Sequence, residues 1–220
     1  MLTLLEKLKS LPLATRSLLL AALMAGLGAL YAGPMLLSPA AVKTANSCAR
    51  PDAAKAAAFR QLATGEMAAV QIATQPNPMP QLAFSAGDGT PRTLADFRGR
   101  TVLLNLWATW CAPCRKEMPA LDTLQAELGG HDFEVVAINI DTRNLDKPRE
   151  WLKDNNISRL AYYGDPQAAV FQALKTAGKA VGMPTTLLID GQGCEIALLH
   201  GPAEWASADG KALIRAALGR

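Results

Sequence analysis

The chain has 220 residues, half of which are apolar, and carries a formal net charge of +3 at pH 7. This length suits one well-packed domain with appended segments and is too short for two full domains. The four cysteines are too few for a small fold held together by disulfides, and the near-neutral charge beyond the first apolar run argues against nucleic-acid binding.

An uncharged apolar run, residues 17–37, is the first feature along the chain. It is long enough to cross a bilayer as one helix. Basic residues precede it, and the next one, Lys43, lies beyond it, so the positive-inside rule places residues 1–16 in the cytoplasm. We therefore expect a single-pass anchor in a bacterial inner membrane, with the rest of the chain in the periplasm. A cleaved signal peptide and lipidation of Cys48 remain as alternatives.

Residues 38–79 have the composition of a stalk between the anchor and a folded domain. The Ala-rich stretch from Ala53 to Ala63 favours a helix, and the proline-rich stretch 76–80 ends any helix. We place the domain boundary there, which leaves residues 80–220 for one globular domain.

The globular domain alternates strand and helix patterns. Gly87-Asp88-Gly89 lies between two short strand-forming stretches and predicts a hairpin at 82–94. Apolar runs typical of buried strands then alternate with amphipathic stretches typical of helices. The predicted strands are 101–107, 133–140, 160–163, 185–189 and 195–199, and the predicted helices are 114–128, 147–155, 167–176 and 207–218. This order indicates an α/β domain with a mixed sheet and helices on both of its faces.

Cys111-Ala112-Pro113-Cys114 stands where the first buried strand gives way to a helix. A cysteine at such a junction has free backbone N–H groups and the positive end of the helix dipole near its sulfur, and both favour thiolate over thiol. Cys114 follows by about one helical turn, so it can close a small disulfide with Cys111. The spacing predicts a redox pair in which Cys111 attacks a substrate disulfide and Cys114 resolves the resulting mixed disulfide.

Three other uses of paired cysteines fit the sequence less well. A zinc site needs a second matching pair, whereas Cys48 and Cys194 are single residues far apart. Haem attachment requires a histidine after the second cysteine, where this chain has Arg115. A carrier that holds Cu(I) on the two thiolates without turnover stays open as an alternative from a different class of function.

Trp107 to Pro119, around the cysteines, and Gly182 to Thr186, before a strand, together resemble the thioredoxin superfamily. Within it they are most similar to the membrane-anchored TlpA-like branch, in particular its rhizobial members. The resemblance covers roughly residues 80–215 and implies a thioredoxin-like fold with an N-terminal hairpin addition. It also implies that Pro184 is cis and faces the cysteine pair, with the backbone of Met183 free to pair with a substrate strand.

The resemblance implies a dithiol reductase of protein disulfides that needs no diffusible cofactor and no metal. In the TlpA-like branch the substrates are copper-site cysteines of cytochrome oxidase subunit II and of Sco-type chaperones, which load copper only when reduced. An inner-membrane reductant of the DsbD or CcdA kind would supply the electrons, and we expect a monomer. A reductase of apocytochrome c in cytochrome c maturation is the rival, although those proteins carry Glu after the cis-proline, where this chain has Thr185.

The resemblance assigns roles to further side chains near the cysteines. Asn105 stands where cytoplasmic thioredoxins have a buried Asp. ResA-type reductases share the Asn and use a Glu at the position of Glu117, which implies a proton-handling role for this residue. A solvated carboxylate beside Lys116 is the alternative interpretation. Trp110 is expected to face the substrate, although a core position would explain it equally well.

The two remaining cysteines, Cys48 and Cys194, lie far from the redox motif in the sequence. In an oxidising compartment such thiols more often pair than stay free. TlpA-like proteins have an extra pair of this kind, so the resemblance implies a structural Cys48–Cys194 disulfide that pins the stalk to the domain. Intermolecular pairing or two reactive thiols are the alternatives.

Overall fold

The computed structural model describes residues 48–49 and 53–220, all of which lie in one compact unit, Asn46–Arg220. The expected anchor, 17–37, and the expected cytoplasmic segment, 1–16, lie outside the described residues. Among the helices that are described, none combines the length and the apolar character needed to cross a bilayer. Membrane attachment therefore stays a prediction.

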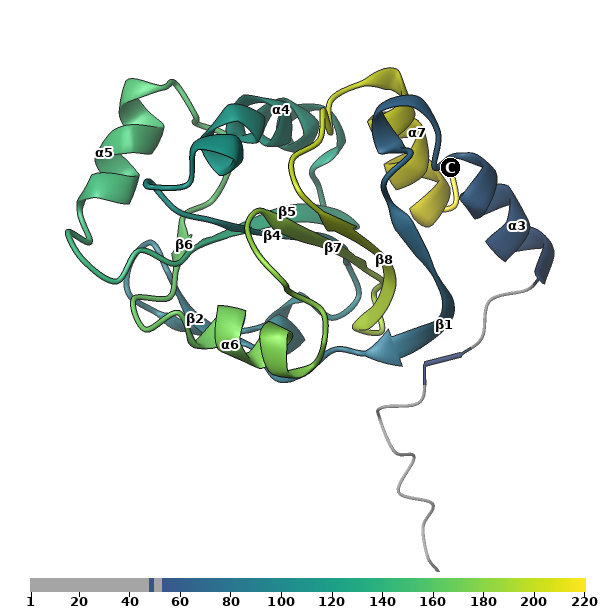
Figure 1. Ribbon diagram of the computed structural model, residues 1–220, viewed down its shortest axis with the longest axis horizontal. Helices are drawn as coiled ribbons and strands as arrows, with labels where there is room; N and C mark the ends of the chain where they lie inside the picture. Colours follow the sequence, from purple (N-terminus) through teal and green to yellow (C-terminus); the bar gives the residue numbers. More distant parts are fainter. Residues whose placement is uncertain (1–47, 50–52) are drawn as a thin grey trace, which may run out of the picture. The chain divides into compact units, whose positions relative to one another are not determined.

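A mixed sheet of eight strands runs through the unit in the order β1-β8-β7-β4-β5-β6-β2-β3 (Figure 1). The strands are β1 (Gln71–Pro78), β2 (Ala83–Ala86), β3 (Pro91–Thr93), β4 (Thr101–Trp107), β5 (Phe133–Asn139), β6 (Tyr163–Gly164), β7 (Thr185–Ile189) and β8 (Cys194–His200). β4 lies parallel to β5 and antiparallel to β7, with Leu104 opposite Val136 and Leu187. Every residue of β4 is buried, as expected for a central strand covered on both faces.

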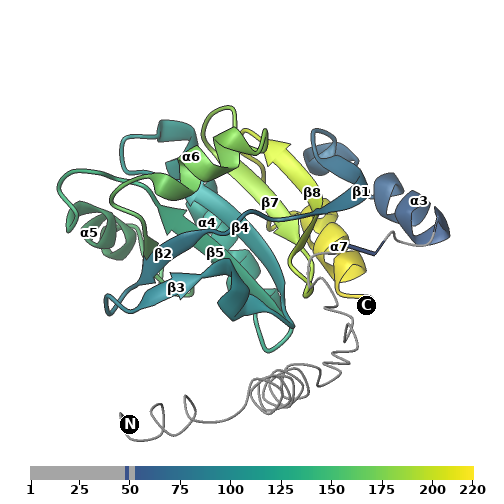
Figure 2. The same cartoon turned by 90° about the horizontal axis from the view of Figure 1, so that it is seen from below.

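Helices cover the sheet from both sides. They are α3 (Ala53–Gln61), α4 (Ala112–Leu128), α5 (Lys147–Asp154), α6 (Ala169–Thr176) and α7 (Ala208–Ala217), with short 3-10 turns at Gly65–Met67 and Leu94–Phe97. α4 and α7 lie on one face of the sheet and α6 lies on the other (Figure 1, Figure 2). α4 buries Met118, Leu121 and Leu124, whose spacing places them along one side of the helix. The predicted α/β architecture, a mixed sheet flanked by helices, is confirmed.

The hairpin predicted at 82–94 is also present, because β2 and β3 pair antiparallel across the Gly87-Asp88-Gly89 turn. Several predicted elements are shorter than expected. The strand predicted at 160–163 is reduced to Tyr163–Gly164, and the helix predicted at 167–176 begins only at Ala169. The backbone of Ala168 is left-handed, with a φ of 52°, so the helix begins only after this residue. The carboxylate of Asp165 accepts a hydrogen bond of 2.7 Å from the backbone N–H of Val170 in the first turn.

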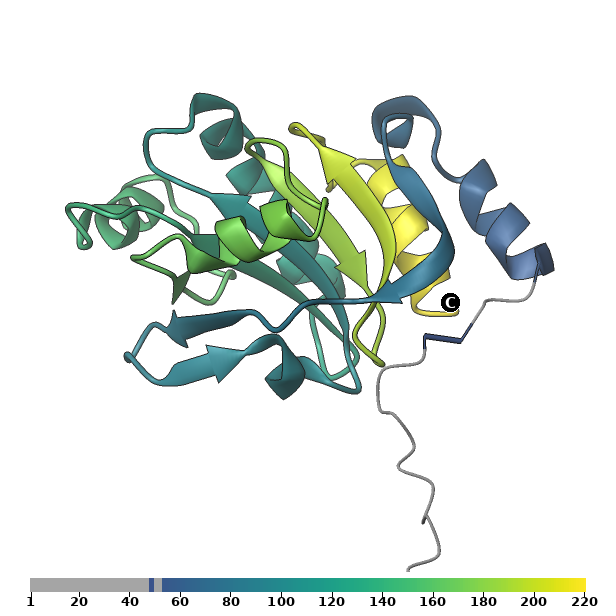
Figure 3. The ribbon, with the colours of Figure 1, turned by 60° about the horizontal axis from the view of Figure 1, so that its bottom comes forward.

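β1 is an edge strand that the sequence did not predict. It pairs antiparallel with β8 and brings Pro78 opposite Cys194. Its prolines are tolerated because an edge strand has one side without a strand partner. The compact unit therefore begins well ahead of the boundary expected at residue 80. After β1 the chain crosses from this edge of the sheet to the β2–β3 hairpin at the opposite edge (Figure 3).

A disulfide joins Cys48 to Cys194, and their Cα atoms are 5.8 Å apart. The two cysteines are 146 positions apart in the sequence, so the bond closes most of the described chain into one loop. Cys194 is the first residue of β8 and is buried. This is the pair that the resemblance implied, and it ties the segment before α3 to the sheet.

Candidate active site

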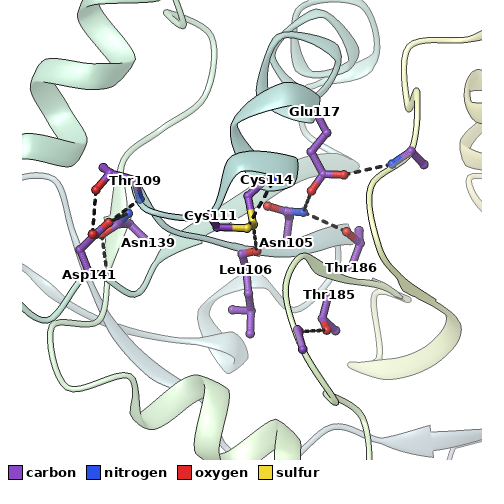
Figure 4. Close-up of a disulfide and its surroundings, with 12 residues drawn as sticks. Asn105, Leu106, Thr109, Cys111, Cys114, Glu117, Asn139, Asp141, Thr185 and Thr186 are labelled. Atoms are coloured by element: carbon purple, nitrogen blue, oxygen red, sulfur yellow. Dashed lines mark hydrogen bonds between the residues drawn. A yellow bond between two sulfur atoms is a disulfide. The ribbon is translucent and has the colours of Figure 1, made fainter.

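Cys111 and Cys114 form a disulfide at the first turn of α4 (Figure 4). Cys111 caps the helix, because its backbone is extended and its Sγ accepts a hydrogen bond of 3.3 Å from the backbone N–H of Cys114. Pro113 fits the first turn, since its missing N–H would have no helical partner there. The helix therefore begins at the redox pair itself, slightly ahead of the predicted start at Cys114.

The two sulfur-bearing residues differ in accessibility. Cys111 keeps 6% of its surface exposed, whereas Cys114 keeps none. The Sγ of Cys114 lies against β4, 3.9 Å from the carbonyl oxygen of Leu106. An incoming sulfur can therefore reach Cys111 and not Cys114. The free N–H groups and the dipole at the start of α4 would stabilise negative charge on the Cys111 sulfur once the pair is reduced.

The loop before β7 lies across a groove from the redox pair. Its Met183–Pro184 peptide bond is cis, and the carbonyl oxygen of Pro184 accepts a hydrogen bond of 2.9 Å from the backbone N–H of Gly201. The groove has a volume of about 570 Å³, and Cys111 is part of its wall. The remaining wall is largely apolar and includes Trp110, Ile140, Ala168, Phe171 and Met183. A substrate segment bound in this groove would therefore contact Cys111 and the cis-proline loop together.

The two tryptophans before Cys111 have different environments. Trp110 is 65% exposed at the edge of the groove. Trp107 is buried, and its ring packs 5.6 Å from that of Trp151. Trp107 is thus a core residue, whereas Trp110 presents an aromatic surface beside the redox pair.

Glu117 lies inside the protein and not in solvent. Its side chain is on the same side of α4 as Cys114, Met118 and Leu121, and only 3% of the residue is exposed. The alternative interpretation, a solvated carboxylate paired with Lys116, is therefore wrong. One carboxylate oxygen accepts a hydrogen bond of 2.7 Å from the side-chain amide of Asn105, and the other accepts one of 3.2 Å from the backbone N–H of Ala203 (Figure 4).

Burial controls the charge of Glu117. Loss of hydration raises the pKa of its carboxyl group to about 7, although the hydrogen bonds from Asn105 and Ala203 act in the opposite direction. Asn105 is itself fully buried on β4 and donates a second hydrogen bond, of 2.9 Å, to the hydroxyl of Thr186 on β7. The carboxyl group therefore sits one helical turn beyond Cys114, is held from β4 and can exchange a proton near neutral pH.

A second polar network, which the sequence reasoning missed, supports the opposite side of the redox loop. The carboxylate of Asp141 accepts hydrogen bonds of 2.8 Å from both the backbone N–H and the hydroxyl of Thr109, and one of 2.7 Å from the side chain of Asn139 (Figure 4). Asp141 is only 5% exposed, and a buried carboxylate needs hydrogen-bond donors in place of water. Thr109 and Asn139 provide these donors. The sequence signal that could have indicated this network is the polar stretch that follows the buried strand β5. The network fixes the residue two positions before Cys111.

The described part of the chain holds no group of three or more His, Cys, Asp or Glu side chains that could bind a metal ion. The site contains two adjacent sulfurs, one accessible and one buried, with a buried carboxyl group nearby.

The fold and the cysteine pair at the start of α4 are those of a thioredoxin-like protein. The chain belongs to the Redoxin family, whose model matches residues 74–213.

Known proteins support this assignment. The chain is 47% identical over 60 residues to the thioredoxin-like protein YneN of Bacillus subtilis, a match that covers 27% of this chain and 35% of that protein. It is 31% identical over 118 residues to the thiol-disulfide oxidoreductase ResA of Geobacillus thermodenitrificans, covering 52% of this chain and 62% of that one. A solved thiol:disulfide interchange protein of the thioredoxin family from Chlorobium tepidum matches with a TM-score of 0.55 at 27% identity, covering 66% of this chain and 98% of that one. The chain thus spans less than two thirds of the first two relatives.

Proposed function

We propose that this protein is a dithiol reductase of protein disulfides that faces the periplasm and is held at the bacterial inner membrane by residues 17–37. The observation that carries the proposal is the Cys111–Cys114 disulfide at the start of α4, with only Cys111 accessible from the groove. This asymmetry separates an attacking sulfur from a resolving sulfur.

The reaction begins with the reduced pair. The Cys111 thiolate attacks one sulfur of a substrate disulfide, that bond breaks, and the released substrate sulfur takes up a proton. Cys111 is now joined by a mixed disulfide to the substrate sulfur that it attacked. Cys114 then loses its proton and attacks the Cys111 sulfur, which closes the enzyme disulfide and releases the second substrate thiol. Two electrons have passed from the cysteine pair to the substrate.

The structure offers a proton acceptor for the step in which the Cys114 thiol loses its proton. Cys114 is fully buried, so its thiol needs a proton acceptor inside the protein to become a nucleophile. Glu117 follows it by one helical turn on the same side of α4, and its pKa of about 7 suits proton exchange at neutral pH. We assign Glu117 this proton-handling role.

The proposed substrates are the oxidised copper-site cysteines of cytochrome oxidase subunit II and of Sco-type chaperones, as in the TlpA-like branch that the sequence resembles. Thr185 supports this choice over apocytochrome c. It follows the cis-proline, is fully buried, and donates its hydroxyl to the carbonyl oxygen of Gly182 at 2.7 Å. No carboxylate therefore follows the proline to face the substrate. A membrane reductant of the DsbD or CcdA kind would reduce the Cys111–Cys114 disulfide again after each reaction.

Reduction of apocytochrome c is the second candidate. The buried Glu117 next to Asn105 favours it, because ResA-type reductases share this combination of residues. A ResA is also among the similar proteins. The two candidates require the same chemistry at Cys111 and differ only in the substrate.

A trapping experiment in the native host distinguishes them. The Cys114→Ser variant of the full chain cannot resolve the mixed disulfide, so it should keep its partners bound to Cys111 until a reductant is added. Cys111→Ser is the matched control and should retain none. Copper-site proteins among the trapped partners would support the proposed substrates, and apocytochromes would support the second candidate. Absence of any partner that depends on Cys111 would refute both.

A further inference from the structure

Trp110 separates two hollows that lie side by side next to Cys111. One is the apolar groove described above. The other, here called the basic pocket, has a volume of about 180 Å³ and is lined by Thr109, Trp110, Asp141, Thr142, Arg143, Asn144 and Lys147. Only Trp110 and Thr142 belong to both hollows. A segment that reaches Cys111 through the groove can therefore extend past Trp110 into the basic pocket.

Positive charge dominates the accessible wall of the basic pocket. Arg143 and Lys147 are exposed, and neither makes an ion pair with any carboxylate of residues 48–49 or 53–220. The negative charge in the wall belongs to Asp141, which is buried and has both oxygens occupied by hydrogen bonds from Thr109 and Asn139. The pocket thus offers two cations to an incoming group and keeps its own anion engaged.

Hydrogen bonds connect the wall of the basic pocket to the segment that carries the redox pair. The carboxylate of Asp141 accepts hydrogen bonds from both the backbone N–H and the hydroxyl of Thr109. Thr109 comes directly before Trp110 and Cys111 in the chain. The same Asp141 begins the segment that carries Arg143 and leads to Lys147, the first residue of α5. A group bound in the pocket therefore lies beside the segment that carries the attacking sulfur.

We propose that the basic pocket binds an acidic side chain of the protein substrate, located within a few residues of the cysteine that Cys111 attacks. The inference rests on the proposed reductase activity and adds a substrate class to it. The preferred substrates are disulfides flanked by Asp or Glu on the side that faces the pocket and by an apolar residue on the side that faces the groove. Charge complementarity at this position selects the partner and accelerates its encounter with Cys111.

The test uses the pre-reduced full chain and synthetic peptides, each closed by one internal disulfide. The peptides differ at a single position, occupied by Asp, Asn or Lys, which is moved through the three residues on either side of each cysteine. The measurement is the second-order rate constant for oxidation of the Cys111–Cys114 pair in a single turnover, so no other reductant is present. At one or more positions we expect the Asp peptide to react about three- to tenfold faster than the Asn peptide, from one or two solvent-exposed ion pairs. The Lys peptide should be slower still, and 0.5 M salt should reduce the differences.

The double variant Arg143→Gln/Lys147→Gln should bring the ratio of Asp to Asn rate constants close to one. Lys153→Gln is the matched control, because it removes one positive charge from the same helix, α5, at a residue that lines neither hollow. The control should retain the ratio of the unmodified chain. An Asp-to-Asn ratio of one at every position, or a ratio that survives in the double variant, would overturn the inference and leave the reductase activity standing. Failure to reduce any of the peptides would overturn both.

Discussion

Asn105 on β4 donates a hydrogen bond of 2.7 Å to the carboxylate of Glu117 on α4, so the central strand holds a buried carboxyl group one turn beyond the resolving cysteine. Ala203 donates the second bond to this carboxylate, at 3.2 Å. These two donors favour the charged form, but loss of hydration outweighs them and raises the pKa of Glu117 to about 7. The carboxyl group of Glu117 therefore becomes negatively charged inside the domain as the pH rises through neutrality.

The free energy of unfolding should change with pH as Glu117 titrates. The folded state keeps the proton on Glu117 up to a pH of about 7, whereas the unfolded chain releases it near the ordinary value of 4.5. The folded state binds more protons between these values, so the free energy of unfolding contributed by Glu117 falls as the pH rises through this window. The shift corresponds to a loss on the order of 3 kcal/mol. Glu117→Gln should remove it, because the amide stays neutral.

Denaturant unfolding of the oxidised protein at pH 5 and at pH 8 measures the effect. The free energy of unfolding of Glu117→Gln, relative to the unmodified chain, should rise between the two pH values by up to about 3 kcal/mol. Glu150→Gln is the matched control, since it changes the same chemical group at an exposed position on α5 and should follow the unmodified chain. Parallel pH dependences for Glu117→Gln and the unmodified chain would show that the carboxyl group does not titrate in this range.

Asn105→Leu should raise the pKa of Glu117 further. The substitution removes a hydrogen bond that stabilises the carboxylate and keeps a side chain of similar size in the core. The carboxyl resonance of Glu117 in ¹³C NMR, assigned by its absence from Glu117→Gln, gives the pKa directly. Thr186→Val is the control, because it removes the other partner of the Asn105 amide and leaves the bond to Glu117 in place. A lower pKa in Asn105→Leu than in the control would contradict this account.

The burial of Glu117 was accessible from the sequence, but the partners of Glu117 were not. Its spacing of three from Cys114 and four from Leu121 places it on the buried side of a helix. Asn105 and Ala203, in contrast, come from positions 12 and 86 residues away, and only the tertiary fold brings them to the carboxylate. Local periodicity predicts which side of an element is buried and gives no information on which distant polar group will meet it.

The same limit explains the missed elements. The buried strands β4 and β7 were predicted because their apolar runs determine both structure and burial. β1 contains prolines and mixed polar residues, and it forms a strand because the exposed edge of β8 offers it hydrogen bonds. The bond between Asp141 and Thr109 spans 32 positions, so it too depends on the pairing of β4 with β5 and not on any local pattern.

The Cys48–Cys194 disulfide should contribute strongly to stability, because it restricts the unfolded chain. Its cysteines are 146 positions apart, and the loop-closure model gives about 5 kcal/mol for a loop of this length. Cys48→Ser/Cys194→Ser should lower the free energy of unfolding by an amount approaching this value. The double variant is used because either single variant would leave one unpaired thiol. Denaturant unfolding with the Cys111–Cys114 pair kept oxidised measures the change, and a loss below about 1 kcal/mol would argue against the constraint.

Substitution of Trp110 should affect substrate reduction, whereas substitution of Trp107 should affect the stability of the fold. Trp110 is 65% exposed, so Trp110→Ala should change the free energy of unfolding by less than about 0.5 kcal/mol. The same variant should reduce insulin several-fold more slowly, because it removes the aromatic wall between the groove and the basic pocket. Trp107 is 1% exposed and packs against Trp151, so Trp107→Ala should cost about 3 to 5 kcal/mol of stability. Denaturant unfolding and the rate of insulin reduction are measured on both variants. If Trp110→Ala loses stability and keeps its rate, the exposed ring is part of the fold and takes no part in binding the substrate.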